Sequence, residues 1–314
     1  GEVVVSFKDF VILPYDGGFL NKNSRKESVA TEIYDYQWEA TELEKTYAHT
    51  TDYNDVILAG ATQNLVQQFS REFDGNVYSV DEEIEESYFL KILELLRNRM
   101  SQKQRGQFSV LINETDYDKY GFIIGMLKSA SKENPRVKTK FISIASMNVK
   151  TGNELVQILK NENLDEQAEV RYLNGTRAVK SASSVPQNQI SDLRIKEGGV
   201  YLITGGAGGI GSVFAEHIAK TQGTQLILTG RRTNNDTIRK YTESLPNAQY
   251  YACDVTKYED VENVIQTILT DYKKIDGIIH CAGIGLASTI IEKTETEIYK
   301  VLPPKIAGVK NLDK

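Results

Sequence analysis

The sequence has few of the residues that form covalent or metal-held frameworks. Its 314 residues include two cysteines, Cys253 and Cys281, and three histidines. Two cysteines make neither a set of disulfide bridges nor a four-cysteine metal site. No apolar run reaches the ~18 residues that a membrane-spanning helix needs, and the first residues lack the charged-then-apolar order of a signal peptide. We therefore expect a cytoplasmic protein without a metal site or a membrane segment.

Positive charge is also in the minority. The formal net charge is -6 and the isoelectric point is about 5.4, which argues against a nucleic-acid-binding surface. Hydrophobic residues make up 40% of the chain and charged residues 25%, as in ordinary globular proteins. A chain of this length exceeds one average domain, so two domains are expected.

The first 32 residues read as a strand and a linker. Residues 1–13 are rich in apolar residues and predict a strand, whereas residues 14–32 begin with a polar stretch rich in turn-forming residues. The strand is either the end of a domain upstream or an edge strand of the next domain, and both readings stay open.

Residues 33–185 alternate between strand and helix patterns. Four short apolar runs, 54–60, 76–80, 107–114 and 137–146, are separated or followed by amphipathic stretches at 61–73, 84–103, 116–134 and 153–163. Residues 168–182 predict a hairpin that turns at Asn174-Gly175. The turn after the first strand carries Gly60 but no spaced glycines, so we expect this domain to bind no cofactor.

Residues 186–314 repeat the alternation after a loop. The predicted strands are 199–205, 225–230, 248–254 and 275–283, and the predicted helices are 209–222, 235–245, 258–272 and 295–314. Strands that alternate with helices predict βαβ units and a parallel sheet. The expected fold class is α/β, with two Rossmann-like, doubly wound parallel-sheet subdomains.

A glycine-rich turn follows the first strand of the second domain and opens a helix. It comprises Thr204, Gly205, Gly206, Ala207, Gly208, Gly209, Ile210 and Gly211. Glycines in this context let the backbone approach a pyrophosphate, and the helix N-terminus offers free N–H groups and a positive dipole end. The segment therefore predicts a dinucleotide site.

The end of the next strand distinguishes between dinucleotides. A carboxylate about 20 residues on would bind the ribose 2′-hydroxyl of NAD, whereas an arginine accommodates a 2′-phosphate. The strand ends at Arg231 and Arg232 with no carboxylate, which favours NADPH. The alternative is two solvated surface arginines.

Two more strand ends supply candidate cofactor residues. Asp254 ends the third strand and Val255 follows it, and a carboxylate at this strand end can reach an adenine amino group. The fourth strand ends in small residues that let the chain run close to a cofactor, namely Cys281, Ala282 and Gly283. We interpret His280 as a packed or hydrogen-bonded residue and both cysteines as small packing residues, because no base is paired with either thiol.

Taken together, these motifs resemble the ketoreductase domains of modular polyketide synthases, a branch of the short-chain dehydrogenases/reductases. The resemblance runs through "YDYQWEATEL" (34–43), the 168–182 hairpin, "TGGAGGIG", "LTGRR", "HCAG" and "PPKIAGVKNL", in the family's order. It covers residues 33–314. It implies that residues 33–185 form a cofactor-free structural subdomain and that residues 186–314 form the N-terminal part of a catalytic, NADPH-binding one. Residues 1–13 resemble the last strand of a dehydratase domain.

The resemblance also implies a reaction. Ketoreductases of this family transfer hydride from NADPH to the β-keto group of an acyl chain on an acyl carrier protein, beside neighbouring synthase domains. A serine and a tyrosine hydrogen-bond and protonate the developing alkoxide, and a lysine lowers the tyrosine pKa. Lys305 in "PPKIAG" matches the position of that lysine.

The sequence departs from the family at the serine and the tyrosine. The catalytic tyrosine is followed four residues later by Asn in these ketoreductases and by Lys in other short-chain dehydrogenases/reductases. None of the 17 tyrosines here is followed by either residue at that spacing. We therefore expect an incomplete catalytic subdomain, completed by further sequence or by a complementary chain, and inactive alone. The alternatives are a non-catalytic scaffold or docking module and a free-standing short-chain dehydrogenase. Gly285, Leu286 and Ala287 stand where one stereochemical subclass carries Leu-Asp-Asp, which favours the other hydroxyl configuration.

Overall fold

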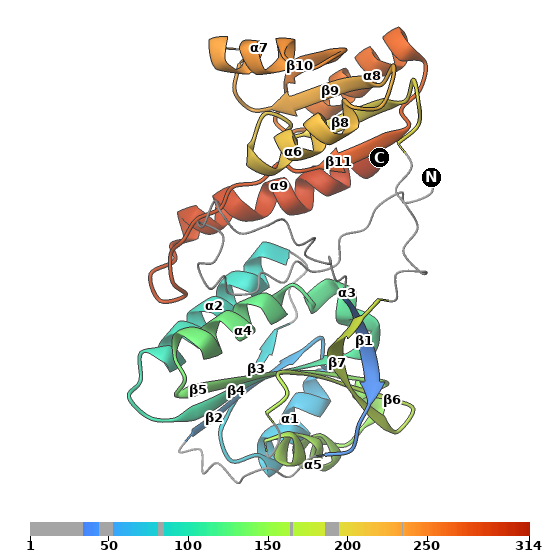
Figure 1. The fold of residues 1–314 in the computed structure, drawn as a ribbon. Helices are drawn as coiled ribbons and strands as arrows, with labels where there is room; N and C mark the ends of the chain where they lie inside the picture. Colours follow the sequence, from blue (N-terminus) through green and yellow to red (C-terminus); the bar gives the residue numbers. More distant parts are fainter. Residues whose placement is uncertain (1–33, 44–52, 81–84, 164–165, 186–194, 234) are drawn as a thin grey trace, which may run out of the picture. The chain divides into compact units, whose positions relative to one another are not determined.

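The computed structural model describes residues 34–43, 53–80, 85–163, 166–185, 195–233 and 235–314. The predicted strand at 1–13 and the predicted linker at 14–32 lie outside these residues. The described chain divides into two compact units (Figure 1). The N-terminal unit holds the described residues up to 185 together with Ser288–Glu292, and the C-terminal unit holds those from 195 to 287 and Lys293–Lys314.

A seven-stranded sheet forms the centre of the N-terminal unit, in the order β1-β7-β6-β5-β4-β2-β3. Strands β3, β2, β4, β5 and β6 run parallel, as the alternating pattern predicts. Their bounds are β2 Tyr53–Ala59, β3 Asn76–Val80, β4 Gly106–Asn113, β5 Val137–Ile144 and β6 Glu169–Leu173.

The other two strands are antiparallel, so this sheet is mixed rather than purely parallel. Strand β7 (Thr176–Ser184) pairs with β6 through a two-residue turn, in which Asn174 has φ 51° and Gly175 has φ 77°. Two residues can only reverse a chain, whereas a parallel connection needs a crossover. Strand β1 (Tyr34–Ala40) then pairs antiparallel with residues 178–184 of β7.

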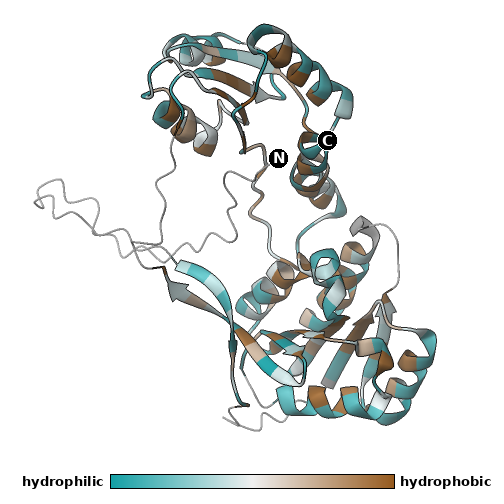
Figure 2. Cartoon of the chain, turned by 90° about the vertical axis from the view of Figure 1, so that its right-hand side faces the viewer, coloured by the Kyte–Doolittle hydropathy of each residue, from teal (hydrophilic) through white to brown (hydrophobic). Residues whose placement is uncertain are grey.

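Helices cover both faces of this sheet. Helices α2 (Glu85–Met100) and α4 (Ile123–Glu133) lie on one face, and α1 (Gln63–Glu72) and α5 (Gly152–Glu162) lie on the other (Figure 1). The short α3 (Tyr117–Tyr120) follows β4. Hydrophobic residues line the strands and the helix sides that face them (Figure 2). The central β4 is buried along nearly its whole length, as expected for a parallel strand covered on both faces.

Side-chain hydrogen bonds hold the loop between β2 and α1. Thr62 caps α1 by accepting a hydrogen bond from the N–H of Leu65, 3.3 Å away. The Asn148 amide accepts from the N–H of Thr62 at 3.2 Å and donates to the carbonyl of Gly60 at 3.2 Å. The α1 N-terminus therefore already has acceptors, which fits the expectation of a cofactor-free domain; that expectation stays a prediction.

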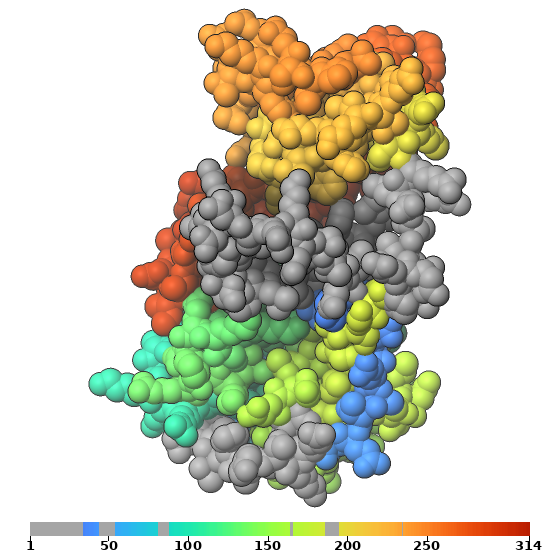
Figure 3. Space-filling view, in the orientation of Figure 1, coloured from blue at the N-terminus to red at the C-terminus, as the bar shows by residue number. Residues whose placement is uncertain are grey.

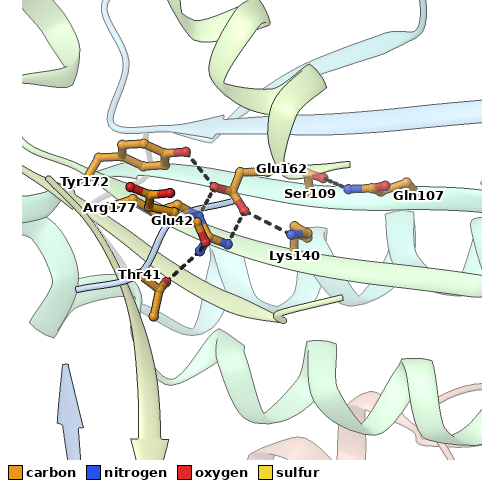
Figure 4. Close-up of polar contacts among 8 residues, drawn as sticks. All are labelled: Thr41, Glu42, Gln107, Ser109, Lys140, Glu162, Tyr172 and Arg177. Atoms are coloured by element: carbon orange, nitrogen blue, oxygen red, sulfur yellow. Dashed lines mark hydrogen bonds and ion pairs between the residues drawn. The ribbon is translucent and has the colours of Figure 1, made fainter. Parts of the chain in front are cut away.

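A buried charged cluster joins α5 to the antiparallel edge of the sheet (Figure 4). The Glu162 carboxylate, fully buried at the end of α5, accepts from Arg177 Nε at 2.7 Å, Lys140 Nζ at 3.0 Å and Tyr172 Oη at 2.6 Å. Arg177 Nη1 donates to Thr41 Oγ1 at 2.8 Å, which attaches the segment after β1. One carboxylate thus organises β5, β6, β7 and α5.

The pKa values in this cluster follow from its contacts. Burial by itself would raise the pKa of Glu162, but Arg177, Lys140 and Tyr172 together hold that pKa below its usual value. Burial and the Glu162 carboxylate raise the pKa of Tyr172, so the phenol stays protonated and donates. The cluster is therefore ionised and fully paired at neutral pH.

The C-terminal unit contains a four-stranded parallel sheet in the order β10-β9-β8-β11. Its strands are β8 Val200–Thr204, β9 Gln225–Gly230, β10 Ala248–Ala252 and β11 Gly277–His280. Helices α6 (Gly209–Ile218) and α7 (Asp236–Glu243) pack on one face, and both lie at the surface shown in Figure 3. Helices α8 (Tyr258–Tyr272) and α9 (Glu295–Asp313) pack on the other. No described helix is both long and apolar enough to span a membrane.

We predict that Glu162→Gln destabilises the N-terminal unit by about 3–5 kcal/mol, because the buried Arg177 and Lys140 lose their shared carboxylate. Trp38, the chain's one tryptophan, lies in β1 of this unit, so urea unfolding followed by tryptophan fluorescence reports on it. The matched control is Glu166→Gln, which removes an exposed 3.9 Å pair with Lys138 and should cost at most about 1 kcal/mol. Equal effects of the two substitutions would contradict the prediction.

Candidate functional site

The strand order of the C-terminal unit marks a place for a ligand. Across the sheet lie the third, second, first and fourth strands of this unit, numbered by their order in the chain. The connections therefore change direction between β8 and β11. In open α/β sheets, ligands bind outside the carboxyl ends of the strands at such a switch point. The glycine-rich turn leaves β8 there, and residues 281–283 leave β11 beside it.

The glycines of the turn are required by close backbone contacts. Gly205 has φ +64°, and a Cβ built on it would lie 2.8 Å from the carbonyl oxygen of Cys281. A Cβ on Gly206 would lie 2.8 Å from Leu228 Cδ2, and one on Gly211 would collide with the Gly205 carbonyl oxygen. Helix α6 therefore starts directly against the end of β8, and the turn passes close to β11.

The N-cap residue of α6 is a glycine, and no side chain of a described residue is seen to cap this helix. Gly208 is the N-cap residue, in extended conformation, and offers no side chain to the first N–H groups of the helix. Ile210 in the first turn is 68% exposed. The first N–H groups of a helix and the positive end of its dipole favour an anion at this position. The turn, which is also shaped by Gly209 and Ala207, could hold a dinucleotide pyrophosphate.

Arg231 and Arg232 follow β9 and are exposed. Neither guanidinium makes an ion pair within the described part of the chain. The backbone beneath them is held, because Tyr250 Oη donates to the Arg232 carbonyl at 2.8 Å. Both side chains are thus available to an anionic ligand.

Asp254 and Val255 follow β10 and shape the start of α8. Asp254 Oδ1 accepts from the N–H of Thr256 at 3.1 Å and from its hydroxyl at 2.8 Å. Asp254 therefore stabilises its own turn, a role that the sequence did not reveal. Val255 is buried, and its carbonyl accepts from Asn311 Nδ2 of α9 at 3.0 Å.

Among the described residues, neither thiol has a neighbour that would activate it. Burial, together with the nearby Asp260 and Asp254, raises the pKa of Cys253 to about 11. Burial also raises the pKa of Cys281. Both are therefore thiols rather than thiolates at neutral pH, consistent with packing residues. Among the described residues, no group of three or more His, Cys, Asp or Glu side chains could hold a metal ion.

His280 joins three segments at the switch point. Its Nδ1 lies 2.7 Å from Thr204 Oγ1 at the end of β8, and its Nε2 lies 2.9 Å from the Pro304 carbonyl oxygen in α9. Thr204 Oγ1 also accepts from the N–H of Ala282 at 3.2 Å. The histidine is thus hydrogen-bonded on both sides, as the sequence interpretation holds.

The partners of His280 assign its proton. The Pro304 carbonyl can only accept, so Nε2 carries the hydrogen, and neutral Nδ1 accepts from the Thr204 hydroxyl. A Cβ on Gly308 would lie 3.3 Å from His280 Cε1 and 3.0 Å from Val255 Cγ2, so this glycine lets α9 come close. Burial lowers the pKa of His280, and its hydrogen bond to Pro304 opposes that shift only in part.

Lys305 is the residue after Pro304, exposed on α9. A Cβ built on Gly283 would lie 3.8 Å from Lys305 Cε. The structure therefore brings Lys305 beside the small residues that follow β11. Gly285, Leu286 and Ala287 continue from there as exposed chain.

Sequence reasoning missed two supports of this site, Tyr250 and Gly308. No local signal marks either one, because the contacts join residues on different strands and helices. By contrast, the spaced glycines signalled the turn directly.

Comparison with known proteins places the site in a family. Residues 199–314 match the KR domain model. Polyketide synthase PksL of Bacillus subtilis (strain 168) is 29% identical over 302 residues, and PksN of the same organism is 30% identical over 247. These alignments cover 92% and 77% of this chain but only 7% and 4% of the two synthases, so the chain spans a small fraction of their length.

Solved structures show the same fold. A ketoreductase domain from the bacillaene assembly line has a TM-score of 0.78 at 24% identity, over 90% of this chain and 70% of that one. An N-terminal ketoreductase from the macrolactin assembly line has a TM-score of 0.64 at 20% identity, over 90% and 71%.

We predict that the imidazole of His280 titrates below the ordinary value of 6.5 and that its neutral form carries the proton on Nε2. The unfolded chain then binds a proton at a higher pH than the folded unit. Neutral His280 therefore contributes stability above pH ~6.5, and this contribution is lost as the pH falls below that value. NMR titration of the three histidines measures the midpoint and the tautomer.

His280→Gln assigns the resonance by its disappearance. A midpoint at or above 6.5 would contradict the lowered pKa, and an Nδ1-protonated neutral form would contradict the hydrogen-bond assignment.

Proposed function

Because this chain belongs to the ketoreductase (KR) domains of polyketide synthases, we propose that its C-terminal unit holds NADPH for the reduction of a β-keto acyl chain. The product would be the β-hydroxy form. The acyl chain would be a thioester on an acyl carrier protein, presented beside neighbouring synthase domains. In this proposal the N-terminal unit has a structural role.

The observation that carries the proposal is the glycine turn at the β8–β11 switch point. Its backbone approaches Cys281 and Ala282 so closely that a side chain at Gly205 would collide, and the α6 N-terminus has no side-chain cap. Both features suit a pyrophosphate. We assign its binding to the backbone of residues 204–211 and place the rest of the cofactor along residues 254–255 and 281–283.

The preference for NADPH rests on Arg231 and Arg232. Two exposed guanidinium groups follow the second strand of the nucleotide-binding order, with no carboxylate at that strand end. A guanidinium presents several N–H donors that suit phosphate oxygens. We propose that they bind the 2′-phosphate.

NADPH, when bound, supplies the hydride for the reaction. The chain's own contribution would be to hold the cofactor and to place the Lys305 side chain beside Gly283, with its Cε 3.8 Å from a Cβ built there. A cation at this position would favour the ionised form of a nearby tyrosine and so ease proton donation to the alkoxide.

The serine and the tyrosine would come from residues outside this sequence, on the same or a complementary chain. No tyrosine here is followed by Lys or Asn four residues later. Strand β11 pairs with β8 on one side, and no other described strand pairs with it. Ile278 on β11 is 41% exposed. An exposed strand edge with apolar side chains suits the addition of a further strand.

Arg231→Ala should weaken NADPH binding about tenfold to a hundredfold and leave NADH binding nearly unchanged, because only NADPH carries the 2′-phosphate. Isothermal titration calorimetry of the chain with both cofactors measures the effect. The control is Arg239→Ala, which removes the same charge from a surface pair with Asp236 on α7. Equal affinities of the unsubstituted chain for both cofactors would overturn the assignment of NADPH.

Residues 1–314 alone should bind NADPH without oxidising it in the presence of a β-keto thioester. Absorbance at the reduced-nicotinamide band, followed with and without a chain that carries the missing serine and tyrosine, tests this. Turnover by residues 1–314 alone would show that the proton donor lies within them.

A further inference from the structure

Tyr250 links two strands at the edge of the proposed 2′-phosphate site. It lies on β10, where it pairs with Leu228 of the neighbouring β9. Its phenol packs on the α6 and α7 face of the sheet. From there its hydroxyl donates a 2.8 Å hydrogen bond to the backbone carbonyl of Arg232, beyond the end of β9.

Gly230 makes this contact possible. It is the diagonal neighbour of Tyr250, two residues along β9 from the paired Leu228, and diagonal neighbours share a face of the sheet. A Cβ built on Gly230 would lie 2.9 Å from Tyr250 Oη. Any side chain at this position would therefore move the phenol away from the Arg232 carbonyl.

The phenol acts as a donor at neutral pH. Burial raises the pKa of Tyr250, and the positive charge of Arg232 only partly opposes this shift. A protonated hydroxyl facing a carbonyl can only donate to it. The hydrogen bond thus fixes the backbone of Arg232, and the guanidinium of the same residue interacts electrostatically with the phenol of Tyr250.

We propose that Tyr250 is a positioning residue for the discrimination of NADPH from NADH. By holding the Arg232 carbonyl, it fixes the backbone from which the Arg231 and Arg232 side chains extend toward the 2′-phosphate. Two long side chains on a fixed backbone lose less conformational freedom on binding than the same side chains on a free turn. This inference rests on the proposed NADPH site.

The neighbouring tyrosine provides a matched control. Tyr251 is on the same strand, but it packs on the opposite face of the sheet, and its hydroxyl donates to Gln249 Oε1 at 2.7 Å. Tyr251→Phe removes a hydroxyl of the same kind without touching the turn. Gly230→Ala disrupts the Tyr250 hydrogen bond from the neighbouring strand β9, because the added methyl group displaces only the hydroxyl end of the Tyr250 side chain.

Calorimetry with NADPH and with NADH on the whole chain tests the inference. Tyr250→Phe should weaken NADPH binding about threefold to tenfold and leave NADH binding unchanged, as expected for one lost hydrogen bond. Gly230→Ala should shift the ratio of the two affinities in the same direction. Tyr251→Phe should leave the ratio as it is.

Four results would overturn the inference. If the unsubstituted chain prefers NADPH and Tyr250→Phe keeps that preference, the inference fails and the proposed function stands. If Tyr250→Phe weakens both cofactors equally, or Tyr251→Phe shifts the ratio as much, the role of Tyr250 is merely structural. If the unsubstituted chain shows no preference, the proposed NADPH site fails, and the inference fails with it.

Discussion

The candidate site of the C-terminal unit depends on the two hydrogen bonds of one half-buried imidazole. His280 accepts from Thr204 at the end of β8 and donates to the Pro304 carbonyl in α9. Buried polar groups need partners, and here each nitrogen has one. Because Thr204 Oγ1 also accepts from Ala282, the glycine turn, the chain after β11 and the helix of Lys305 are aligned together. The position of Lys305 beside Gly283 follows from this alignment.

Absent side chains are as important as present ones. Gly205 and Gly211 let the α6 N-terminus sit against β8, and Gly308 lets α9 approach His280 and Val255. The N-terminal unit has a related alternation of strands and helices, but the loop between β2 and α1 differs from the glycine turn between β8 and α6. There Thr62 and Asn148 occupy the donors and acceptors around the start of α1. Similar architectures therefore present an uncapped helix end in one unit and a capped one in the other.

Patterns of short range predicted most of the elements. Periodicity gave the strand and helix order, and Asn174-Gly175 predicted the hairpin whose positive φ values the structure contains. Contacts between distant residues could not be read in this way. The 43 acidic and 37 basic residues allow very many pairs, and only the tertiary fold selects Glu162 with Arg177 and Lys140. The pairing of β1 with β7 and the partners of His280 and Tyr250 have the same origin.

The two units differ in how far their charged groups are paired. In the N-terminal unit the buried carboxylates of Glu162, Glu169 and Asp55 each contact a cation within the unit. Such pairs offset the cost of removing charge from water, and they leave little for a ligand. In the C-terminal unit, Arg231 and Arg232 form no ion pair with a described residue, and α6 begins without a cap. The positive charge of these arginines and of the helix end is therefore not neutralised by the described residues at the edge of the sheet where the strands end. An anionic ligand that bridges the helix end and the arginines would satisfy both, and a dinucleotide with a pyrophosphate and a 2′-phosphate carries negative charge at two such separated positions.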